Sequence, residues 1–477
     1  MITFLICLTL LVAAYFCYGA YLDHVCQING KAEVPSKSHY DGVDYIPLPR
    51  WRTFLIQLLN IAGVGPIFGA IMGACYGPVA FLWITFGGIF LGAMHDYVSA
   101  VISLRHGGLS IPEIIGIYLG DKTKFVLRVF SIVVLVLVGA VFIRTPANLL
   151  DGMFESIGLW WWIGLIIAYY FVATLLPIDK LIGKIYPIFG AALIFMALGL
   201  LGVILLGDYT VPELTEIRNQ HFDAESLPLI PTLCITIACG AISGFHATQS
   251  PLMARCVNNE KECRSVFYGA MITESVIALI WAAIGMAFFG GVEALQEALA
   301  AHGNDAGWAV NLIANTTLGV AGGLLALLGV VAAPITSGDT AFRSARLIIA
   351  DIFHIDQKSI VKRLAVSAVL FAVGISLLFV NFDVLWRYFA WSNQTLSVFV
   401  LWTITVYLYK KGGQVYWLSL IPALFMTYIC SSYVFVSEKE FIGMENRTLA
   451  YILGGVATLV IAFLASLKCR RDDKSKA

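Results

Sequence analysis

Long apolar segments recur along the whole chain and are separated by short polar loops. A helix needs about 20 predominantly apolar residues to cross the hydrocarbon core of a bilayer. Reading the chain for such segments predicts an all-α polytopic membrane protein with about thirteen transmembrane helices. These are expected near residues 2–21, 53–75, 79–104, 123–143, 157–176, 184–206, 229–250, 266–290, 309–335, 360–380, 388–409, 415–436 and 447–467.

Basic residues alternate between the loops in the way this helix count requires. Every second loop and the C-terminal tail together contain 25 of the 30 Lys and Arg residues, and the opposite side contains 5. The basic side of a membrane protein faces the cytoplasm. We therefore expect the N-terminus outside, the C-terminus in the cytoplasm, and a location in a bacterial cytoplasmic membrane.

Two predicted helices carry residues that interrupt a helix. The first contains "NIAGVGPIFGAIMG" and the other, five helices later, contains "ACGAISGFHATQSP". An interior glycine costs about 1 kcal/mol relative to alanine and a proline about 3 kcal/mol. Non-helical backbone at membrane depth is tolerated where it lines a protein-enclosed cavity, and a matching pair of interrupted helices indicates a secondary transporter. The alternative is close helix packing through small residues.

An odd number of helices in each half makes the predicted repeats inverted, in a five-plus-five arrangement. The expected substrate-binding residues are Gly63, Gly65, Pro66, Gly69, Gly240, Ser243, Gly244, Phe245 and His246. The expected organisation is an additional N-terminal helix (1–22), a cytoplasmic loop (23–52), a first repeat (53–206), an outer loop (207–228), a second repeat (229–409), two additional helices (410–467) and a basic cytoplasmic tail (468–477).

Ionisable residues inside predicted transmembrane helices are the next candidates, because such residues are costly in lipid and usually functional. His95 and Asp96 lie in "LGAMHDYVSAV", and Glu274 lies in the counterpart helix in "MITESVIA". Asp96 is either a proton carrier or an acceptor that caps neighbouring backbone. His246 is either a proton-coupling residue or a hydrogen-bonded packing histidine.

A second candidate ion site lies in "AAPITSGDTAFRSAR". The hydroxyls of Thr336 and Ser337 and the carboxylate of Asp339 are oxygen ligands that suit a hard cation such as sodium. Alternatively, Asp339 is a helix cap or the partner of Arg343, four residues later. The polar "WSNQT" (391–395) is expected to tie helices together.

Composition supports the membrane assignment and removes other classes. The chain is 59% hydrophobic and 13% charged, whereas a soluble domain contains about 25% charged residues. A net charge of zero gives no reason to expect a nucleic-acid partner. Ten scattered cysteines without a CxxC pair argue against a disulfide framework or a zinc site. The first apolar segment lacks the basic start and cleavage site of a signal peptide and is expected to be a retained helix.

These motifs together resemble the carbon starvation protein A (CstA) family. The segments that carry the resemblance are "AGVGPIFGAIMG", "LGAMHDYVSAVISLRHGG", "ACGAISGFHA", "SVFYGAMITES", "DTAFRSAR" and "WSNQT", in this order between about residues 50 and 400. The resemblance implies an uptake transporter with a leucine-transporter-like fold, of a kind linked to pyruvate and short peptides and usually coupled to protons. It also implies that Thr336 and Ser337 lie near the second sodium position of that fold.

The chain departs from the longer members of that family at several positions. Ile56 and Gln57 replace a histidine pair, His95 replaces a glutamine, and Pro251 comes four residues sooner. The chain is also much shorter than those members, which have roughly 700 residues.

The predicted function is ion-coupled uptake of a small metabolite, a pyruvate-like carboxylate or a short peptide, by alternating access. The coupling ion is expected to be H⁺, with Na⁺ as the alternative. No nucleotide or catalytic motif is present, so no enzyme activity and no cofactor are expected. The expected partners are the substrate and membrane lipid. The rival functions are an uncoupled channel or facilitator and a membrane-embedded nutrient sensor.

Overall fold

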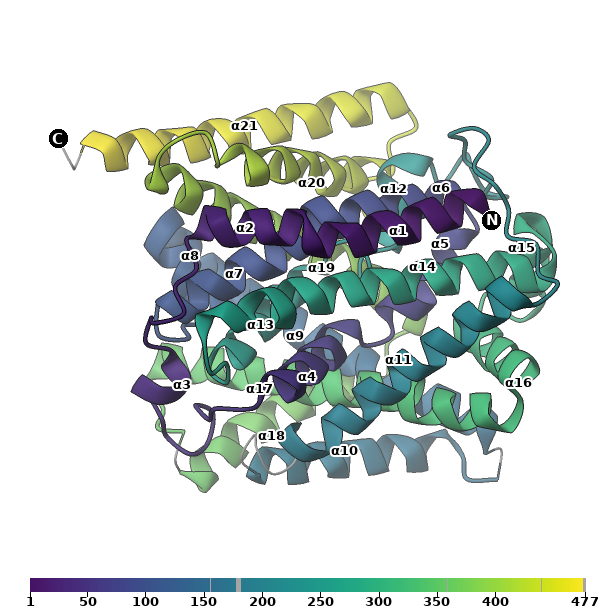
Figure 1. The fold of residues 1–477 in the computed structure, drawn as a ribbon, viewed down its shortest axis with the longest axis horizontal. Helices are drawn as coiled ribbons and strands as arrows, with labels where there is room; N and C mark the ends of the chain where they lie inside the picture. Colours follow the sequence, from purple (N-terminus) through teal and green to yellow (C-terminus); the bar gives the residue numbers. More distant parts are fainter. Residues whose placement is uncertain (155, 177–181, 358, 439, 475–477) are drawn as a thin grey trace.

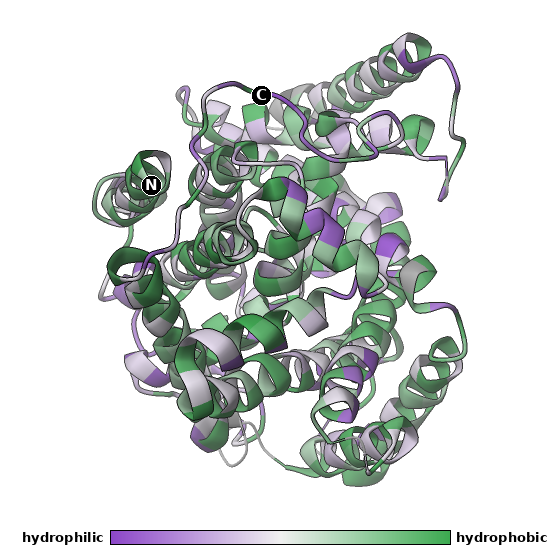
Figure 2. Ribbon diagram, turned by 90° about the vertical axis from the view of Figure 1, so that its right-hand side faces the viewer, coloured by the Kyte–Doolittle hydropathy of each residue, from purple (hydrophilic) through white to green (hydrophobic). Residues whose placement is uncertain are grey.

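The computed structural model describes residues 1–154, 156–176, 182–357, 359–438 and 440–474. Within these residues every regular element is helical, and most long helices run side by side along one direction (Figure 1). Viewed along the bundle, the ribbon carries the colour of hydrophobic residues in inner and outer helices alike (Figure 2). The all-α class of a polytopic membrane protein is therefore confirmed.

The first half of the chain forms the helices α1 (Ile2–Phe16), α2 (Tyr18–Cys26), α3 (Pro35–Ser38), α4 (Arg50–Ala62), α5 (Ala70–Ala74), α6 (Val79–Leu82), α7 (Met94–Arg105), α8 (Ile111–Leu119), α9 (Asp121–Met153), α10 (Leu159–Leu175) and α11 (Ile182–Leu206). Two π-helical segments, η1 (Gly65–Gly69) and η2 (Trp83–Ala93), lead into α5 and α7.

The second half forms α12 (Leu229–Thr236), α13 (Gly244–Ala254), α14 (Gly269–Phe289), α15 (Val292–Ala301), α16 (Ala306–Leu325), α17 (Ala332–Phe353), α18 (Ile360–Leu377), α19 (Phe382–Lys411), α20 (Trp417–Val436) and α21 (Arg447–Lys474). A short 3₁₀ turn, η3 (Glu260–Glu262), precedes the π-helical η4 (Arg264–Tyr268) and α14, and η5 (Ala326–Val331) joins α16 to α17.

Fewer helices of the described chain can span a membrane than the sequence predicts. Nine are long and apolar enough, or ten if the bent pair of α4 with residues 65–74 counts as one. Part of the difference comes from interrupted or short helices: α12 and α13 are only 8 and 11 residues long, and α10 has 17. In addition, Ala306–Phe353 forms one apolar run of 48 residues. The count of thirteen is not confirmed, and the inverted repeat remains a prediction.

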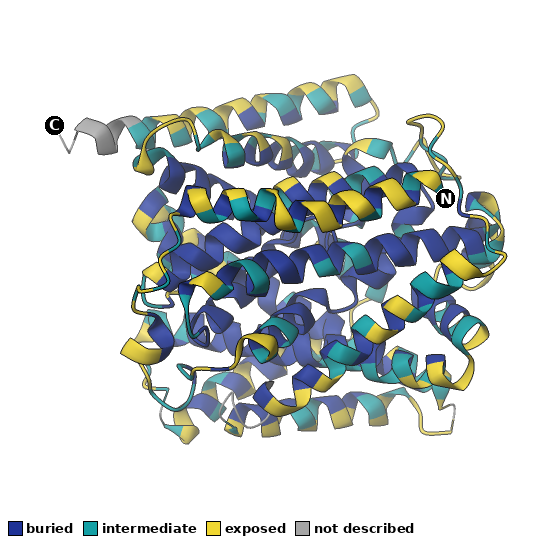
Figure 3. Ribbon diagram, viewed as in Figure 1, coloured by how far each residue is buried: buried dark blue, intermediate teal, exposed yellow. Residues whose placement is uncertain are grey.

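Burial separates the central helices from those at the surface. The apolar window of Glu260–Phe289 is 78% buried, whereas that of Arg447–Cys469 is 17% buried. Figure 3 shows the same difference, with α13 and α14 largely dark blue and α21 largely yellow and teal. The exposed faces of the outer helices are apolar, as expected for surfaces in contact with lipid. Residues on α7, α13 and α14 are therefore shielded from solvent.

Both interruptions expected from the sequence are present. α4 ends at Gly63, which has a φ of +49°, and the axis bends by 56° before residues 65–74. α12 ends at Thr236 and α13 begins at Gly244; Gly240 between them has a φ of +92°. Such φ values are unfavourable for residues with a Cβ atom. Gly63 and Gly240 therefore allow these two segments of the chain to leave the helical path.

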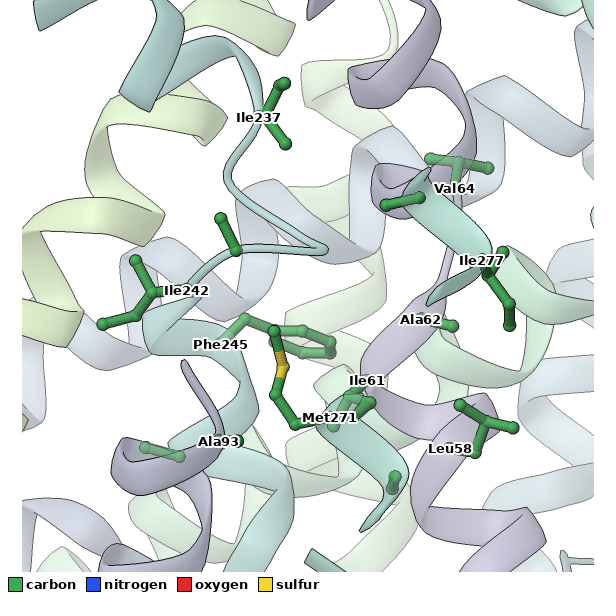
Figure 4. Close-up of a cluster of buried hydrophobic side chains, with 14 of the residues drawn as sticks. Leu58, Ile61, Ala62, Val64, Ala93, Ile237, Ile242, Phe245, Met271 and Ile277 are labelled. Carbon is green, nitrogen blue, oxygen red and sulfur yellow. The ribbon is translucent and has the colours of Figure 1, made fainter. Parts of the chain in front are cut away.

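Apolar side chains surround the two interruptions. Figure 4 shows Ile61 of α4, Phe245 of α13 and Met271 of α14 packed close to the non-helical backbone around Ile242. The interruptions also touch each other, since a Cβ atom at Gly65 would collide with the Cβ and Sγ atoms of Cys239. Polar groups placed here are in a medium of low dielectric constant and need a partner.

The contact between Gly65 and Cys239 gives a prediction about stability. Gly65→Ala should lower the stability of the protein by about 1–3 kcal/mol, because overpacking forces one interrupted segment away from the other. Thermal unfolding of the detergent-purified protein, followed by tryptophan fluorescence, measures the change.

Gly164→Ala is the matched control. Gly164 lies in α10, where a Cβ atom would meet nothing within 4 Å, and alanine there should leave stability unchanged or raise it by up to about 1 kcal/mol. Equal unfolding temperatures for the two variants would show that the interrupted segments are not in close contact.

Candidate functional site

Four of the ionisable residues chosen from the sequence lie in one connected chain. His95 Nδ1 is 2.8 Å from Asp96 Oδ1, and His246 Nδ1 is 2.9 Å from Asp96 Oδ2. On the other side of the same imidazole, His246 Nε2 is 3.5 Å from Glu274 Oε2. All four side chains have 0% exposure. The contacts therefore run from His95 to Asp96, from Asp96 to His246, and from His246 to Glu274.

Three helices place these side chains. His95 and Asp96 lie in the first turn of α7, His246 lies in the first turn of α13, and Glu274 lies in α14. α7 packs against α13, and the π-helical segment before α7 packs against α14. Because the helix is interrupted before α13, His246 lies at the start of a helix. In a continuous helix it would lie in the middle. Residues about 150 positions apart thus share one site.

Hydrogen bonding determines how the central imidazole is protonated. An ionised carboxylate only accepts hydrogen bonds, so the Nδ1 atoms of His95 and His246 both donate to Asp96. In neutral His246 the remaining nitrogen, Nε2, then carries a lone pair and faces an oxygen of Glu274. Among the described residues, no well-formed hydrogen bond reaches Nε2 or either Glu274 oxygen, and the Cys239 thiol and the Gly240 backbone lie beside them. Two buried acceptors facing each other are unfavourable unless a proton lies on one of them.

The thiol of Cys239 lies beside the contact between His246 and Glu274, and it is a third kind of group that can bind a metal ion. One donor atom each from Cys239, His246 and Glu274 lies within 4.8 Å of the others. A thiol, an imidazole and a carboxylate are all ligands that zinc accepts. A single proton already satisfies the contact between His246 and Glu274, and we therefore interpret the group as a proton site. Sequence reasoning missed Cys239, because a cysteine in an apolar segment is read as a small hydrophobic residue.

A residue from another helix caps the start of α13. The backbone N–H of Phe245 donates to Asn393 Oδ1 at 2.6 Å, and the Asn393 side chain also bonds the hydroxyl of Ser243 at 2.9 Å. Asn393 belongs to the "WSNQT" segment of α19 and is fully buried. The expectation that this segment ties helices together is confirmed for Asn393. It also satisfies an N–H of the first turn that has no partner within the helix.

The residues predicted to bind substrate all lie at the two interruptions. Gly63 follows the last residue of α4, while Gly65, Pro66 and Gly69 belong to η1. The other five lie between the break and the first turn of α13: Gly240, Ser243, Gly244, Phe245 and His246. Of these nine residues, His246 belongs to the buried ionisable chain, and Gly240 lies beside Glu274.

The second candidate ion site is separate from the buried group of His95, Asp96, His246 and Glu274. The hydroxyl of Ser337 in α17 donates to the carbonyl of Leu59 in α4 at 2.8 Å. The hydroxyl of Thr336 donates to carbonyls of its own helix, Ala332 and Ala333, at 3.0 and 2.8 Å. Asp339 accepts a hydrogen bond from Tyr186 at 2.7 Å. The structure therefore joins α17 to the interrupted helix α4 and does not bring these residues to Glu274.

Two solved structures share this fold. A manganese transporter from Eremococcus coleocola matches with a TM-score of 0.59 at 12% identity, covering 91% of this chain and 99% of that one. MhsT, solved in complex with L-phenylalanine, matches with a TM-score of 0.53 at 14% identity, covering 87% of this chain and 98% of that one. The fold, the broken helices and the buried ionisable site define a secondary transporter.

The sequence also identifies the family. The profile described as "Carbon starvation protein CstA" matches residues 1–159 and 147–321. The chain therefore belongs to the CstA family, and the resemblance seen in its motifs is confirmed.

Relatives within this family differ in how much of them is covered. An uncharacterized membrane protein of Haemophilus influenzae is 42% identical over an alignment of 351 residues, and the match covers 63% of this chain and 95% of that protein. A peptide transporter CstA of Bacillus subtilis is 27% identical, over 57% of this chain and 55% of that one. The pyruvate/proton symporter BtsT of Escherichia coli is 26% identical, over 56% and 46%. The chain thus matches about half the length of the two named transporters.

The capping role of Asn393 is testable through stability. Asn393→Leu should cost about 1–3 kcal/mol, because it leaves the Phe245 N–H and the Ser243 hydroxyl buried without their partner. Thermal unfolding of the purified protein measures the loss.

Asn315→Leu makes the same chemical change on the exposed face of α16, where Asn315 bonds only within its own helix. This control should unfold at the wild-type temperature or above it. If Asn393→Leu is as stable as this control, α19 does not hold the start of α13.

Proposed function

We propose that the protein is a proton-coupled secondary transporter for uptake of a small metabolite, either a pyruvate-like carboxylate or a short peptide. The observation that carries the proposal is the contact between His246 Nε2 and Glu274 Oε2, a buried pair of acceptors that needs a proton. The names of relatives support both substrate classes and, for one of them, proton symport. Their bacterial sources support a cytoplasmic membrane, with the basic loops inside.

Substrate would bind where the helices are interrupted. The start of α13 carries the positive end of a helix dipole, which suits a substrate carboxylate. Non-helical backbone near Gly63 and Gly240 would supply further hydrogen bonds. In the proposed alternating-access cycle the two halves form an inverted repeat, and the helices that carry the interruptions move relative to the others.

Coupling would follow from the charge of the buried chain. With Asp96 and Glu274 both ionised and both histidines neutral, the four side chains carry two negative charges. A proton on His246 or Glu274 removes one of them and makes the site more favourable for an anionic group nearby. By thermodynamic reciprocity, bound substrate then raises the affinity for the proton. Binding of the proton thus promotes binding of the substrate and the reverse, and this mutual effect is the basis of symport.

Proton flux into sodium-free proteoliposomes tests the proposal. Pyruvate or a dipeptide should cause alkalinisation outside, together with accumulation above equilibrium. Glu274→Gln should abolish both but keep exchange of substrate across the membrane, because the carboxamide resembles the protonated acid and cannot release a proton. Asp96→Asn should lose transport more broadly, since asparagine keeps only one acceptor oxygen and its NH2 group faces the Nδ1–H of the second histidine.

Glu293→Gln is the control, because Glu293 is an exposed carboxylate at the start of α15 and should keep full coupling. Substrate uptake that stops at equilibrium would replace symport by facilitated diffusion, and binding without uptake would favour a sensor. Flux that disappears when a chelator is added would contradict the assignment of Cys239, His246 and Glu274 to a proton.

The structure around α17 favours the proton over sodium. The hydroxyl oxygens of Ser337 and Thr336 and the carbonyl oxygens that would surround a sodium ion instead bond each other directly, at 2.8–3.0 Å, so a sodium ion could lie between them only after these contacts open. Ser337→Ala should therefore change the sodium dependence of uptake by less than about twofold, although it removes the link between α17 and Leu59.

Uptake of labelled substrate with and without sodium, at a fixed proton gradient, measures this effect. Thr340→Val is a matched control, because the Thr340 hydroxyl bonds only carbonyls of its own helix. Sodium stimulation that is present in the wild type and the control but absent in Ser337→Ala would assign the coupling ion to sodium.

A further inference from the structure

Two grooves open on the surface of the protein at the start of α4, and Trp51 lines both of them. The first has a volume of about 510 Å³ and lies between α1, α4 and α14. The second has a volume of about 550 Å³ and lies between α4 and α11, with Leu325 at its edge. Trp51 lines both grooves and is 56% exposed. Tryptophan concentrates at the membrane interface, so this residue indicates the depth of lipid headgroups.

The walls of the second groove are apolar and face outward. Ile188 and Phe195 are 59% and 63% exposed, and Leu55, Pro187 and Ala191 complete the wall. Leu55 belongs to α4 and the other four residues belong to α11, and these two helices pack against each other. A groove of this kind on a membrane-facing surface suits an acyl chain.

The two grooves differ in their positive charges. The first contains one basic residue, Arg50, whereas the second contains two, Arg52 and Lys184. The guanidinium of Arg52 lies 5.1 Å from the ring centre of Trp51, a contact that holds the cation at the interface. Within the described part of the chain, neither Arg52 nor Lys184 forms an ion pair with a carboxylate. The second groove therefore has two cations available for an anion.

We propose that the groove between α4 and α11 is a binding site for an anionic phospholipid. The phosphate lies between Arg52 and Lys184, and one acyl chain follows the apolar wall past Ile188 and Ala191 toward Phe195. Basic pockets between transmembrane helices on the cytoplasmic side bind anionic headgroups. The long Lys184 side chain reaches a headgroup while its stem stays on apolar surface.

The site also has a consequence for α4. Residues 50–62 form the first part of an interrupted span, and Leu59 in this part accepts the hydrogen bond from Ser337. A lipid bound to Arg52 restrains the N-terminal end of the same helix and favours the conformation seen here. This effect on transport rests on the proposed function, whereas lipid binding itself does not.

Native mass spectrometry of the delipidated full-length protein tests the site. Phosphatidylglycerol and phosphatidylcholine with identical acyl chains are the two probes. The wild type should bind phosphatidylglycerol about tenfold more tightly or better, and the double variant Arg52→Gln/Lys184→Gln should lose this preference. Arg50→Gln is the matched control, because it removes one cation from the neighbouring groove and should change the preference less than twofold.

A second variant tests the groove independently of charge. Ala191→Phe keeps both cations but fills the apolar wall, and it should weaken phosphatidylglycerol binding about tenfold. Unchanged binding in Ala191→Phe would mean that the cations act only as a charged surface, and it would overturn the groove. Equal binding of the two lipids by the wild type, or an equal loss in Arg50→Gln and the double variant, would overturn the site.

Proton-driven uptake in the same variants separates the two proposals. If the lipid preference is lost while uptake stays coupled, the lipid site exists and acts at most as a modulator. If the wild type has the lipid preference but shows no proton flux, the proposed function fails and the lipid site stands.

Discussion

Two carboxylates share one buried imidazole, and the charge of this group constrains everything around it. Asp96 and Glu274 lie on opposite ring nitrogens of His246, with no exposure to solvent. Ionised groups without compensation are very costly in a medium of low dielectric constant. In the proposed function, the site therefore takes up a proton before the conformation changes. The unloaded, doubly charged site would resist this change, and that resistance would couple the ion to the substrate.

The interrupted backbone serves the same group. Because α13 begins only at Gly244, His246 lies in its first turn, where the positive end of the helix dipole partly compensates two nearby carboxylates. Asn393 fixes this turn from α19, and the contact between Gly65 and Cys239 sets the position of one interruption against the other. A continuous helix through residues 237–243 would lose this dipole at the site. The breaks and the ionisable chain are thus parts of one arrangement.

The sequence predicts the parts of this arrangement better than their connections. Asp96, His246 and Glu274 are recognisable because ionisable residues are costly within apolar segments, and Gly63 and Gly240 because glycine weakens a helix. The order in which the three side chains meet depends on packing between α7, α13 and α14, which no local pattern contains. Cys239 is hidden by its apolar character. The helix count was less predictable, since α12 and α13 are each too short to span and α16 continues through η5 into α17.

Helix α4, the first part of the interrupted span, connects the site to both the protein core and the lipid surface. Its 13 residues cover about 20 Å, from the groove beside Trp51 to the break at Gly63. Between these ends, the hydrogen bond from Ser337 to Leu59 holds the helix against α17. A hydrogen bond of this type contributes about 0.5–1.5 kcal/mol, and coupling between two bound ligands typically amounts to 1–3 kcal/mol. In the proposed function, proton and substrate together would therefore supply enough free energy to break this contact. Because the bond is weak, the proposed lipid at the N-terminal end of α4 would help to keep this helix in the position seen here.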